Sequence, residues 1–196
     1  MKIVIRAGGL GVRLWPFSRQ NNPKQFQALL GNKTMIRTTY ERVARLLNRP
    51  EDLFISINEL MVQRLKLEIP EVKLSNIIVE TECRNTGPAM CLEVCYLQKY
   101  CQPNDIIASI PSDDYISNNK AFADLLRSSE QFLRQNPDYI LTPATKPTHV
   151  NTGYSYLKAG QNLQNVGHEV IFTVSDVVEK PDEDYCQQLI NSGVYY

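Results

Sequence analysis

A glycine-rich stretch near the N-terminus decides the fold: RAGGLGVRLWPFSR occupies residues 6–19, and PKQF follows at residues 23–26. The stretch comes directly after an apolar, β-branched run that predicts a buried strand. Glycines allow a tight turn and let backbone N–H groups approach an anion closely. The cations Arg13 and Lys24 follow at positions from which they are expected to clamp phosphates. The sequence therefore predicts a phosphate-binding loop after the first strand.

The spacing of this loop excludes two common phosphate-binding motifs. Arg13 and Leu14 stand where the dinucleotide-binding turn Gly-x-Gly-x-x-Gly would place its third glycine. The segment GNKT at 31–34 is not a Walker P-loop, because Asn32 separates the glycine from the lysine. We interpret it as a turn followed by a helix cap. A glycine cluster alone would indicate only a tight turn, and the basic residues that follow favour phosphate binding.

Apolar runs alternate with stretches of helical period, which predicts an α/β fold with a mainly parallel sheet flanked by helices. The expected strands are Lys2–Arg6, Leu53–Ile57, Asn76–Val79, Asp105–Ile110, Tyr139–Thr142, Tyr154–Lys158 and Glu169–Val178. The expected helices are Met35–Leu47, Glu59–Leu67, Gly87–Tyr100, Lys120–Arg134 and Glu183–Ile190, with Thr34 and Asn119 as N-caps. Ligands of open α/β sheets bind at the carboxyl ends of the strands, so the loops after Ala7, Glu80 and Pro111 should converge.

The composition limits the classes of protein to which the chain can belong. With 196 residues, 43% of them hydrophobic, residues 1–196 are expected to form one domain around one core. Lysine plus arginine (21) equal aspartate plus glutamate (21), which gives no basic surface for nucleic acid. No run of about 18 apolar residues predicts a membrane span, so a cytoplasmic protein is expected. The five cysteines lack CxxC spacing and are expected to be reduced, mostly buried thiols.

The glycine-rich stretch resembles the N-terminal signature of sugar-1-phosphate nucleotidyltransferases. Its RLWP and PKQF pieces are similar to those of mannose-1-phosphate guanylyltransferases, also called GDP-mannose pyrophosphorylases. Four later segments resemble the same family in the same order: ETECRNTGPA at 80–89, IPSDD at 110–114, KPTHVNTGYSY at 146–156 and VVEKPD at 177–182. The resemblance covers nearly the whole chain and implies a Rossmann-like nucleotide-diphospho-sugar transferase fold.

The resemblance also implies GTP and mannose 1-phosphate as substrates, GDP-mannose and pyrophosphate as products, and Mg²⁺ as cofactor. The triphosphate is expected against the backbone and cations of the first loops, namely Ala7, Gly8, Gly9, Gly11, Arg13 and Lys24. The base or ribose and the hexose are expected near Arg84, Asn85, Gly153 and Glu179. The resemblance makes Asp113 the metal ligand and gives Lys180 the task of neutralising the sugar phosphate.

Several of these residues also have a structural interpretation when they are taken singly. Asn85 suits a helix cap. Asp113 or Asp114 suits a turn after the strand. Glu179 and Lys180 suit an ion pair at a strand end, followed by a helix that a proline starts.

The family pattern continues beyond NSGVYY at 191–196, so the domain is expected to be incomplete and to lack a second metal-binding aspartate. Six positions differ from that pattern: Arg6, Val12, Asp114, Val150, Asn151 and Ser155. These features leave two alternatives open: a non-catalytic or weakly active nucleotide-binding fragment, and a nucleotidyltransferase for another base and sugar. The sequence does not distinguish a monomer from a homo-oligomer.

Overall fold

The computed structural model describes residues 1–9, 14–19, 22–29 and 31–196. The roles predicted for Gly11 and Arg13 concern positions outside the described residues. The chain divides into two compact units, Met1–Leu126 and Arg127–Tyr196. Each unit has its own strands and its own buried apolar clusters.

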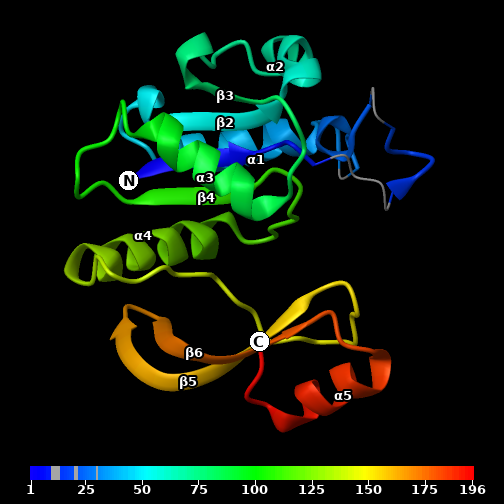
Figure 1. Ribbon diagram of the computed structural model, residues 1–196, viewed down its shortest axis with the longest axis vertical. Helices are drawn as coiled ribbons and strands as arrows, with labels where there is room; N and C mark the ends of the chain where they lie inside the picture. The colour runs from blue at the N-terminus through cyan, green and yellow to red at the C-terminus, as the bar shows by residue number, and fades with distance from the viewer. Residues whose placement is uncertain (10–13, 20–21, 30) are drawn as a thin grey trace. The chain divides into compact units, whose positions relative to one another are not determined.

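The Met1–Leu126 unit is built on a four-stranded parallel sheet in the order β3-β2-β1-β4 (Figure 1). The strands are β1 (Lys2–Arg6), β2 (Leu53–Asn58), β3 (Ile77–Glu80) and β4 (Ile107–Pro111). In the register of the sheet, Ile5 lies between Ile55 of β2 and Ile110 of β4. A parallel strand with neighbours on both sides and helices on both faces is buried throughout, which explains the continuous apolar run that begins the chain.

Helices cover both faces of this sheet: α1 (Met35–Ala44), α2 (Val62–Glu68) and α3 (Thr86–Leu97) (Figure 1). Successive strand residues point to opposite faces. Ile3 and Ile5 therefore belong to the core that contains Ile36 of α1 and Leu65 of α2. Val4 belongs to a second core, which contains Leu97 of α3.

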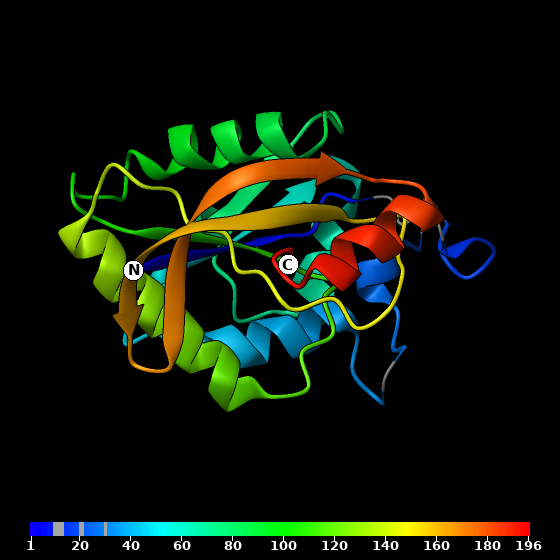
Figure 2. The same cartoon turned by 90° about the horizontal axis from the view of Figure 1, so that it is seen from below.

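The Arg127–Tyr196 unit is an antiparallel hairpin of β5 (Ser155–Val166) and β6 (Glu169–Glu179), followed by α5 (Glu183–Ser192) (Figure 2). Cys186 and Leu189 of α5 pack with Tyr156 of β5 and with Tyr195. A long helix, α4 (Asn119–Gln135), runs across the division between the units. Its Phe132 packs with Val166 and Ile171 of the hairpin.

The predicted α/β fold is confirmed, and most elements lie within a few residues of their expected ends, but three predictions are wrong. Residues 139–142 form no strand, and Ile140 is 91% exposed. A short apolar run becomes a strand only where another strand pairs with it, and in the described part of the chain β4 pairs with β1 alone. Helix α1 ends at Ala44 instead of Leu47. Asn118, not Asn119, caps α4, because Asn118 Oδ1 accepts a hydrogen bond from Ala121 N at 3.0 Å.

The cysteines are all free, as predicted, but they are not mostly buried. Cys83, Cys91 and Cys95 are exposed, and Cys186 is buried. The two thiols of α3 lie on its outward side, because Glu93 and Leu97 are the residues that this helix buries. None of the helices in the described part of the chain has the length and apolar character needed to span a bilayer.

Candidate active site

Three loops leave the carboxyl ends of the parallel strands side by side, as the sequence predicts. Ala7 N donates to Ser56 O of β2 at 2.7 Å, and Ser112 N donates to Arg6 O of β1 at 2.9 Å. The loops that follow β1 and β4 are therefore fastened to the same edge of the sheet. This edge is where ligands of open α/β sheets bind.

Glu80, at the end of β3, places its carboxylate against the glycine loop. A Cβ atom at Gly8 would lie 2.7 Å from both carboxylate oxygens of Glu80. The Ser56 hydroxyl donates to Glu80 Oε1 at 2.7 Å and holds the buried carboxylate in place. A side chain at position 8 would therefore displace Glu80. The sequence interpretation assigned Glu80 no role, although an acidic residue at the end of an apolar strand was an available signal.

Lys24 and Asp113, predicted for the triphosphate and the metal, are brought together. Lys24 Nζ lies 3.1 Å from Asp113 Oδ2. Lys24 begins a short 3-10 helix, Lys24–Phe26, whose Gln25 and Phe26 are buried. The Gln25 side chain donates to the carbonyl of Ala7, which ties this helix to the glycine loop. A cation and a carboxylate from distant parts of the chain thus share one edge of the sheet.

Asp114 follows directly on the predicted metal ligand. Partial removal of the Asp114 carboxyl group from water raises its pKa, and the neighbouring charge of Asp113 raises the pKa further. The positive charges of Lys24 and Arg42 act in the opposite direction. The loop after β4 therefore carries two carboxyl groups whose negative charge is partly neutralised by nearby cations.

A further carboxyl group lies beneath the site on the α3 face of the sheet. Glu93 is 1% exposed and accepts a hydrogen bond from the Ser109 hydroxyl of β4 at 2.6 Å. Its Oε1 atom has no hydrogen-bond partner among the described residues. Burial raises the pKa of Glu93, whereas the Ser109 hydrogen bond and the charge of Arg6 lower it. Arg6 therefore places a positive charge near a buried acid.

Arg84 and Asn85 lie in the loop between β3 and α3. Arg84 forms an ion pair with Glu82, and its side chain is 71% exposed. Asn85 holds the N-cap position of α3, as its structural interpretation predicts, but its side chain makes no capping hydrogen bond. The φ of Asn85 is 65°, in the left-handed region that favours glycine. A backbone outlier in a loop beside a candidate site is a reason to suspect a functional constraint.

The residues expected at the sugar lie together in the Arg127–Tyr196 unit. Ser155 and Glu179 are direct neighbours in the β5–β6 register, and the Ser155 hydroxyl donates to the Glu179 carboxylate. Lys180 Nζ lies 2.7 Å from Glu179 Oε1. Gly153 N donates to Asn151 Oδ1 at 2.9 Å, which shapes the turn before β5. Gly153, Glu179 and Lys180 thus gather at one end of the hairpin.

The structural interpretation of this hairpin end is confirmed for the ion pair but not for the start of the helix, because Asp182 is the N-cap of α5 and Pro181 precedes it. Glu179 and Lys180 form the expected ion pair at the end of β6. Pro181 follows, and Asp182 caps α5 by accepting a hydrogen bond from Tyr185 N at 2.8 Å. The geometry is therefore compatible with both interpretations, and the role of these residues toward a sugar phosphate stays a prediction.

Comparison with known proteins decides the family. A family model described as nucleotidyl transferase matches residues 2–196. The chain belongs to the nucleotidyl transferase family. It is 34% identical to mannose-1-phosphate guanylyltransferase RfbM of Salmonella typhimurium and 33% identical to mannose-1-phosphate guanylyltransferase of Klebsiella pneumoniae. Each match covers 98% of this chain but only 39% and 40% of the relative, so the chain spans about two fifths of their length.

Solved structures share the fold of this chain. The crystal structure of a protein named mannose-1-phosphate geranyltransferase from Thermus thermophilus superimposes with a TM-score of 0.80 at 25% identity, over 99% of this chain and 54% of that one. Mannose-6-phosphate isomerase from Helicobacter pylori gives a TM-score of 0.69 at 20% identity, over 100% of this chain and 66% of that one. The second match concerns the fold alone. The family resemblance read from the sequence is thus confirmed.

Asp113 suits a divalent-cation site that takes its other ligands from the substrate and from water. Among the residues that the structure describes, no three His, Cys, Asp or Glu side chains gather into a complete metal site. Mg²⁺ commonly binds proteins through one or two carboxylates and takes its other ligands from phosphate and water. A single carboxylate at the edge of the sheet, 3.1 Å from Lys24, the predicted phosphate ligand, fits this mode.

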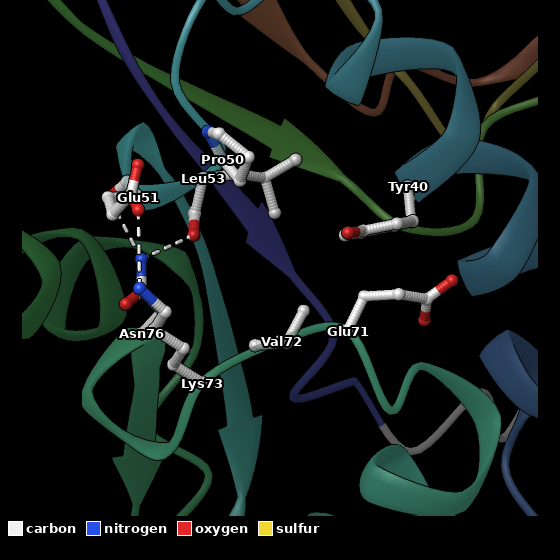
Figure 3. Close-up of a pocket in the computed structure, with 8 residues that line it drawn as sticks. All are labelled: Tyr40, Pro50, Glu51, Leu53, Glu71, Val72, Lys73 and Asn76. Atoms are coloured by element: carbon white, nitrogen blue, oxygen red, sulfur yellow. Dashed lines mark hydrogen bonds and ion pairs between the residues drawn. The ribbon is translucent and has the colours of Figure 1, made fainter.

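A small cavity at the opposite edge of the sheet is not the nucleotide site. It is lined by Tyr40, Pro50, Glu51, Leu53, Glu71, Val72, Lys73 and Asn76 (Figure 3). Leu53 begins β2, so the cavity lies away from the carboxyl ends of the strands. The Asn76 amide closes it by donating to the carbonyls of Glu51 and Leu53. Its volume of about 20 Å³ admits a water molecule and no nucleotide.

Proposed function

We propose that this chain forms the nucleotide-binding and sugar-phosphate-binding part of a mannose-1-phosphate guanylyltransferase. The reaction transfers the guanylyl group of GTP to mannose 1-phosphate and releases pyrophosphate. The observation that carries the proposal is the Lys24–Asp113 pair beside the glycine loop, at the carboxyl edge of a parallel sheet. The names of the relatives support the choice of nucleotide and sugar.

The transfer requires that the two substrates are positioned and that the negative charges of their phosphates are neutralised. An oxygen of the sugar phosphate attacks the α-phosphorus of GTP, and the bond from that phosphorus to the pyrophosphate oxygen breaks. No covalent nucleophile of the protein is needed for such a transfer. Lys24 would neutralise the triphosphate, and backbone N–H groups at Gly8 and Gly9 would line it. The role of Arg13 stays a prediction from the family resemblance.

Asp113 would hold Mg²⁺ at the sheet edge. The ion, when bound, neutralises phosphate oxygens and orients them. Lys24 now lies beside this carboxylate, and the Asp113 side chain is 43% exposed, so a cation from solvent can reach it. The proposed cofactor role requires Lys24 to move from Asp113 to the phosphates.

Glu80 supports the choice of guanine. The edge of guanine offers two neighbouring N–H donors, and a carboxylate can accept both. The Glu80 carboxylate is buried beside Gly8 and already accepts a hydrogen bond from Ser56. Uracil and thymine offer only one N–H on the corresponding edge. Arg84 and Asn85 in the following loop would contact the base or the ribose.

Glu179 and Lys180 would serve the second substrate. Glu179 can accept hydrogen bonds from sugar hydroxyls, and the Lys180 ammonium group can neutralise the attacking phosphate. Close approach of the backbone at Gly153 would allow contact with the hexose. A cytoplasmic location stays a prediction of the sequence.

Calorimetric titration with GTP, ATP, UTP and dTTP in the presence of Mg²⁺ tests this proposal. We expect GTP to bind at least tenfold more tightly than the other three, a difference of about 1.4 kcal/mol. Pyrophosphate release on addition of mannose 1-phosphate would then identify an active transferase. Binding of GTP without pyrophosphate release would identify the non-catalytic alternative. Equal or absent binding of all four nucleotides would refute the proposed site.

A further inference from the structure

Helix α1 fastens both ends of the loop that carries Asp113. The Thr39 hydroxyl donates to Ser112 O at 3.3 Å, at the start of this loop. Arg42 Nε donates to Asn119 Oδ1 at 2.9 Å, where the loop enters α4. Residues three apart on a helix lie on the same face, so one side of α1 presents both donors to the loop.

The position of Arg42 is unfavourable for a purely structural residue. Arg42 is 8% exposed, and its Nη1 atom is buried without a hydrogen-bond partner among the described residues. Its guanidinium group lies over the Phe122 ring, 6.0 Å from the centroid. A buried charge with incomplete hydrogen bonding opposes folding, so an apolar side chain would stabilise this position at least as well. The arrangement therefore points to a role outside stability.

Asp114 supplies the reason for a positive charge at this position. The Arg42 guanidinium and the Asp114 carboxylate attract each other electrostatically. Asp114 is the direct neighbour of Asp113, whose carboxylate lies 3.1 Å from Lys24 Nζ. Arg42 thus acts on the loop at two points, Asn119 at its end and Asp114, two residues after its start.

We propose that Arg42 is a positioning residue, which holds the loop of residues 112–119 so that Asp113 stays at the sheet edge, ready to share a divalent cation with the nucleotide. This inference rests on the proposed function, because it concerns the ion that Asp113 would bind. Arg42 itself is buried and would touch neither substrate. Its removal should therefore impair the use of Mg²⁺ more than the binding of the nucleotide.

The test compares Arg42→Met and Arg42→Lys with Arg45→Met, a matched control at the exposed C-cap of the same helix. GTP binding is measured by calorimetry with Mg²⁺ and with a chelator instead. Loss of a residue that orients a metal ligand commonly lowers metal affinity roughly 10–100-fold. We expect Arg42→Met to weaken GTP binding about tenfold or more with Mg²⁺ and to leave binding with the chelator unchanged. Arg42→Lys should restore part of the Mg²⁺ effect, and Arg45→Met should match the unmodified chain.

A second variant and a second measurement guard against misfolding of Arg42→Met. Asn119→Ala removes the acceptor of the Arg42 hydrogen bond at an exposed position. This variant should reduce the dependence of GTP binding on Mg²⁺, as Arg42→Met does. Amide hydrogen exchange should be faster at residues 112–119 in both variants and unchanged in β1.

The outcomes separate the two proposals. If the unmodified chain binds no GTP with Mg²⁺, the proposed function fails, and this inference fails with it. If the unmodified chain binds GTP but Arg42→Met loses equal affinity with Mg²⁺ and with the chelator, only the inference is overturned. It is overturned equally if Asn119→Ala retains the full Mg²⁺ dependence of the unmodified chain.

Discussion

Lys24 Nζ and Asp113 Oδ2 lie 3.1 Å apart although 89 residues separate them in the sequence. Their side chains are 28% and 43% exposed. Ion pairs with this much access to water contribute at most about 1 kcal/mol to stability. The two charges therefore neutralise each other with little gain in stability. The pair can open at little cost in free energy when a phosphate binds Lys24 and a metal ion binds Asp113.

Replacement of Lys24 by alanine should weaken GTP binding strongly and stability weakly. A charge-assisted contact to phosphate contributes about 1.5–3 kcal/mol, so the Kd should rise roughly 10–100-fold. The free energy of unfolding should change by less than about 1 kcal/mol. Calorimetry and urea unfolding measure the two quantities. Lys33→Ala is the control, because Lys33 pairs with Glu41 on the surface. An unchanged Kd for Lys24→Ala would remove this lysine from the site.

Asp113→Asn should abolish the benefit of Mg²⁺ for GTP binding. In the unmodified chain, removal of Mg²⁺ with a chelator should weaken GTP binding, because the Asp113 carboxylate then repels the triphosphate. The asparagine variant lacks both the metal ligand and this repulsion. Its affinity should therefore be nearly the same with and without Mg²⁺. A variant that keeps the full Mg²⁺ effect would show that another group holds the ion.

Gly8→Ala should destabilise the chain by about 1–2 kcal/mol, because the Glu80 carboxylate must move away and lose its hydrogen bond from Ser56. Gly9→Ala is a matched control, since no described heavy atom lies within 4 Å of a Cβ built there. Urea unfolding of the two variants gives the comparison. In a Ser56→Ala background the effect of Gly8→Ala should shrink, because the hydrogen bond is already absent. Equal losses in both backgrounds would contradict this explanation.

Glu93→Gln should stabilise the chain at neutral pH and not in acid. Burial raises the pKa of Glu93 above the ordinary value of 4.5. A carboxyl group with a raised pKa opposes folding once the pH exceeds the unfolded-state value, because the unfolded chain then loses its proton first. The variant should gain about 1 kcal/mol at pH 7. The gain should disappear as the pH falls to the ordinary value and below.

Urea unfolding at several pH values measures this difference in the free energy of unfolding. Glu59→Gln provides the control, because Glu59 is exposed. It should leave the free energy nearly unchanged at every pH. A gain for Glu93→Gln that did not vary with pH would show that packing, and not the ionisation of this carboxyl group, is responsible.

Much of the parallel sheet could be predicted because its signal is local. Strands buried on both faces are continuous apolar runs, so β1 and β2 were located within a residue of their observed ends. The segment at 139–142 has the same local signal and forms no strand. Whether this segment forms a strand depends on pairing with a neighbouring strand, which no local sequence pattern specifies.

The site was predictable only in part, for a related reason. Lys24 and Asp113 each lie in a motif with a family resemblance, but their contact is a product of the folded sheet. Glu80 begins the segment at 80–89 that resembles the family, but the segment by itself gives this residue no role, and Arg42 lies in none of the resembling segments. The Glu80 carboxylate packs against Gly8. Arg42 donates a hydrogen bond to Asn119, 77 residues away along the chain. Such roles need tertiary contacts to be recognised.

Cys91 and Cys95 lie one turn apart on the outward side of α3, and both thiols are exposed. A reagent with two thiol-reactive arms could bridge them and fix a fluorophore rigidly to this helix. α3 begins directly after Arg84 and Asn85, in the loop proposed to contact the nucleotide. The chain thus contains a natural attachment point for a spectroscopic reporter near that loop, which would follow the arrival of a ligand without any engineered residue.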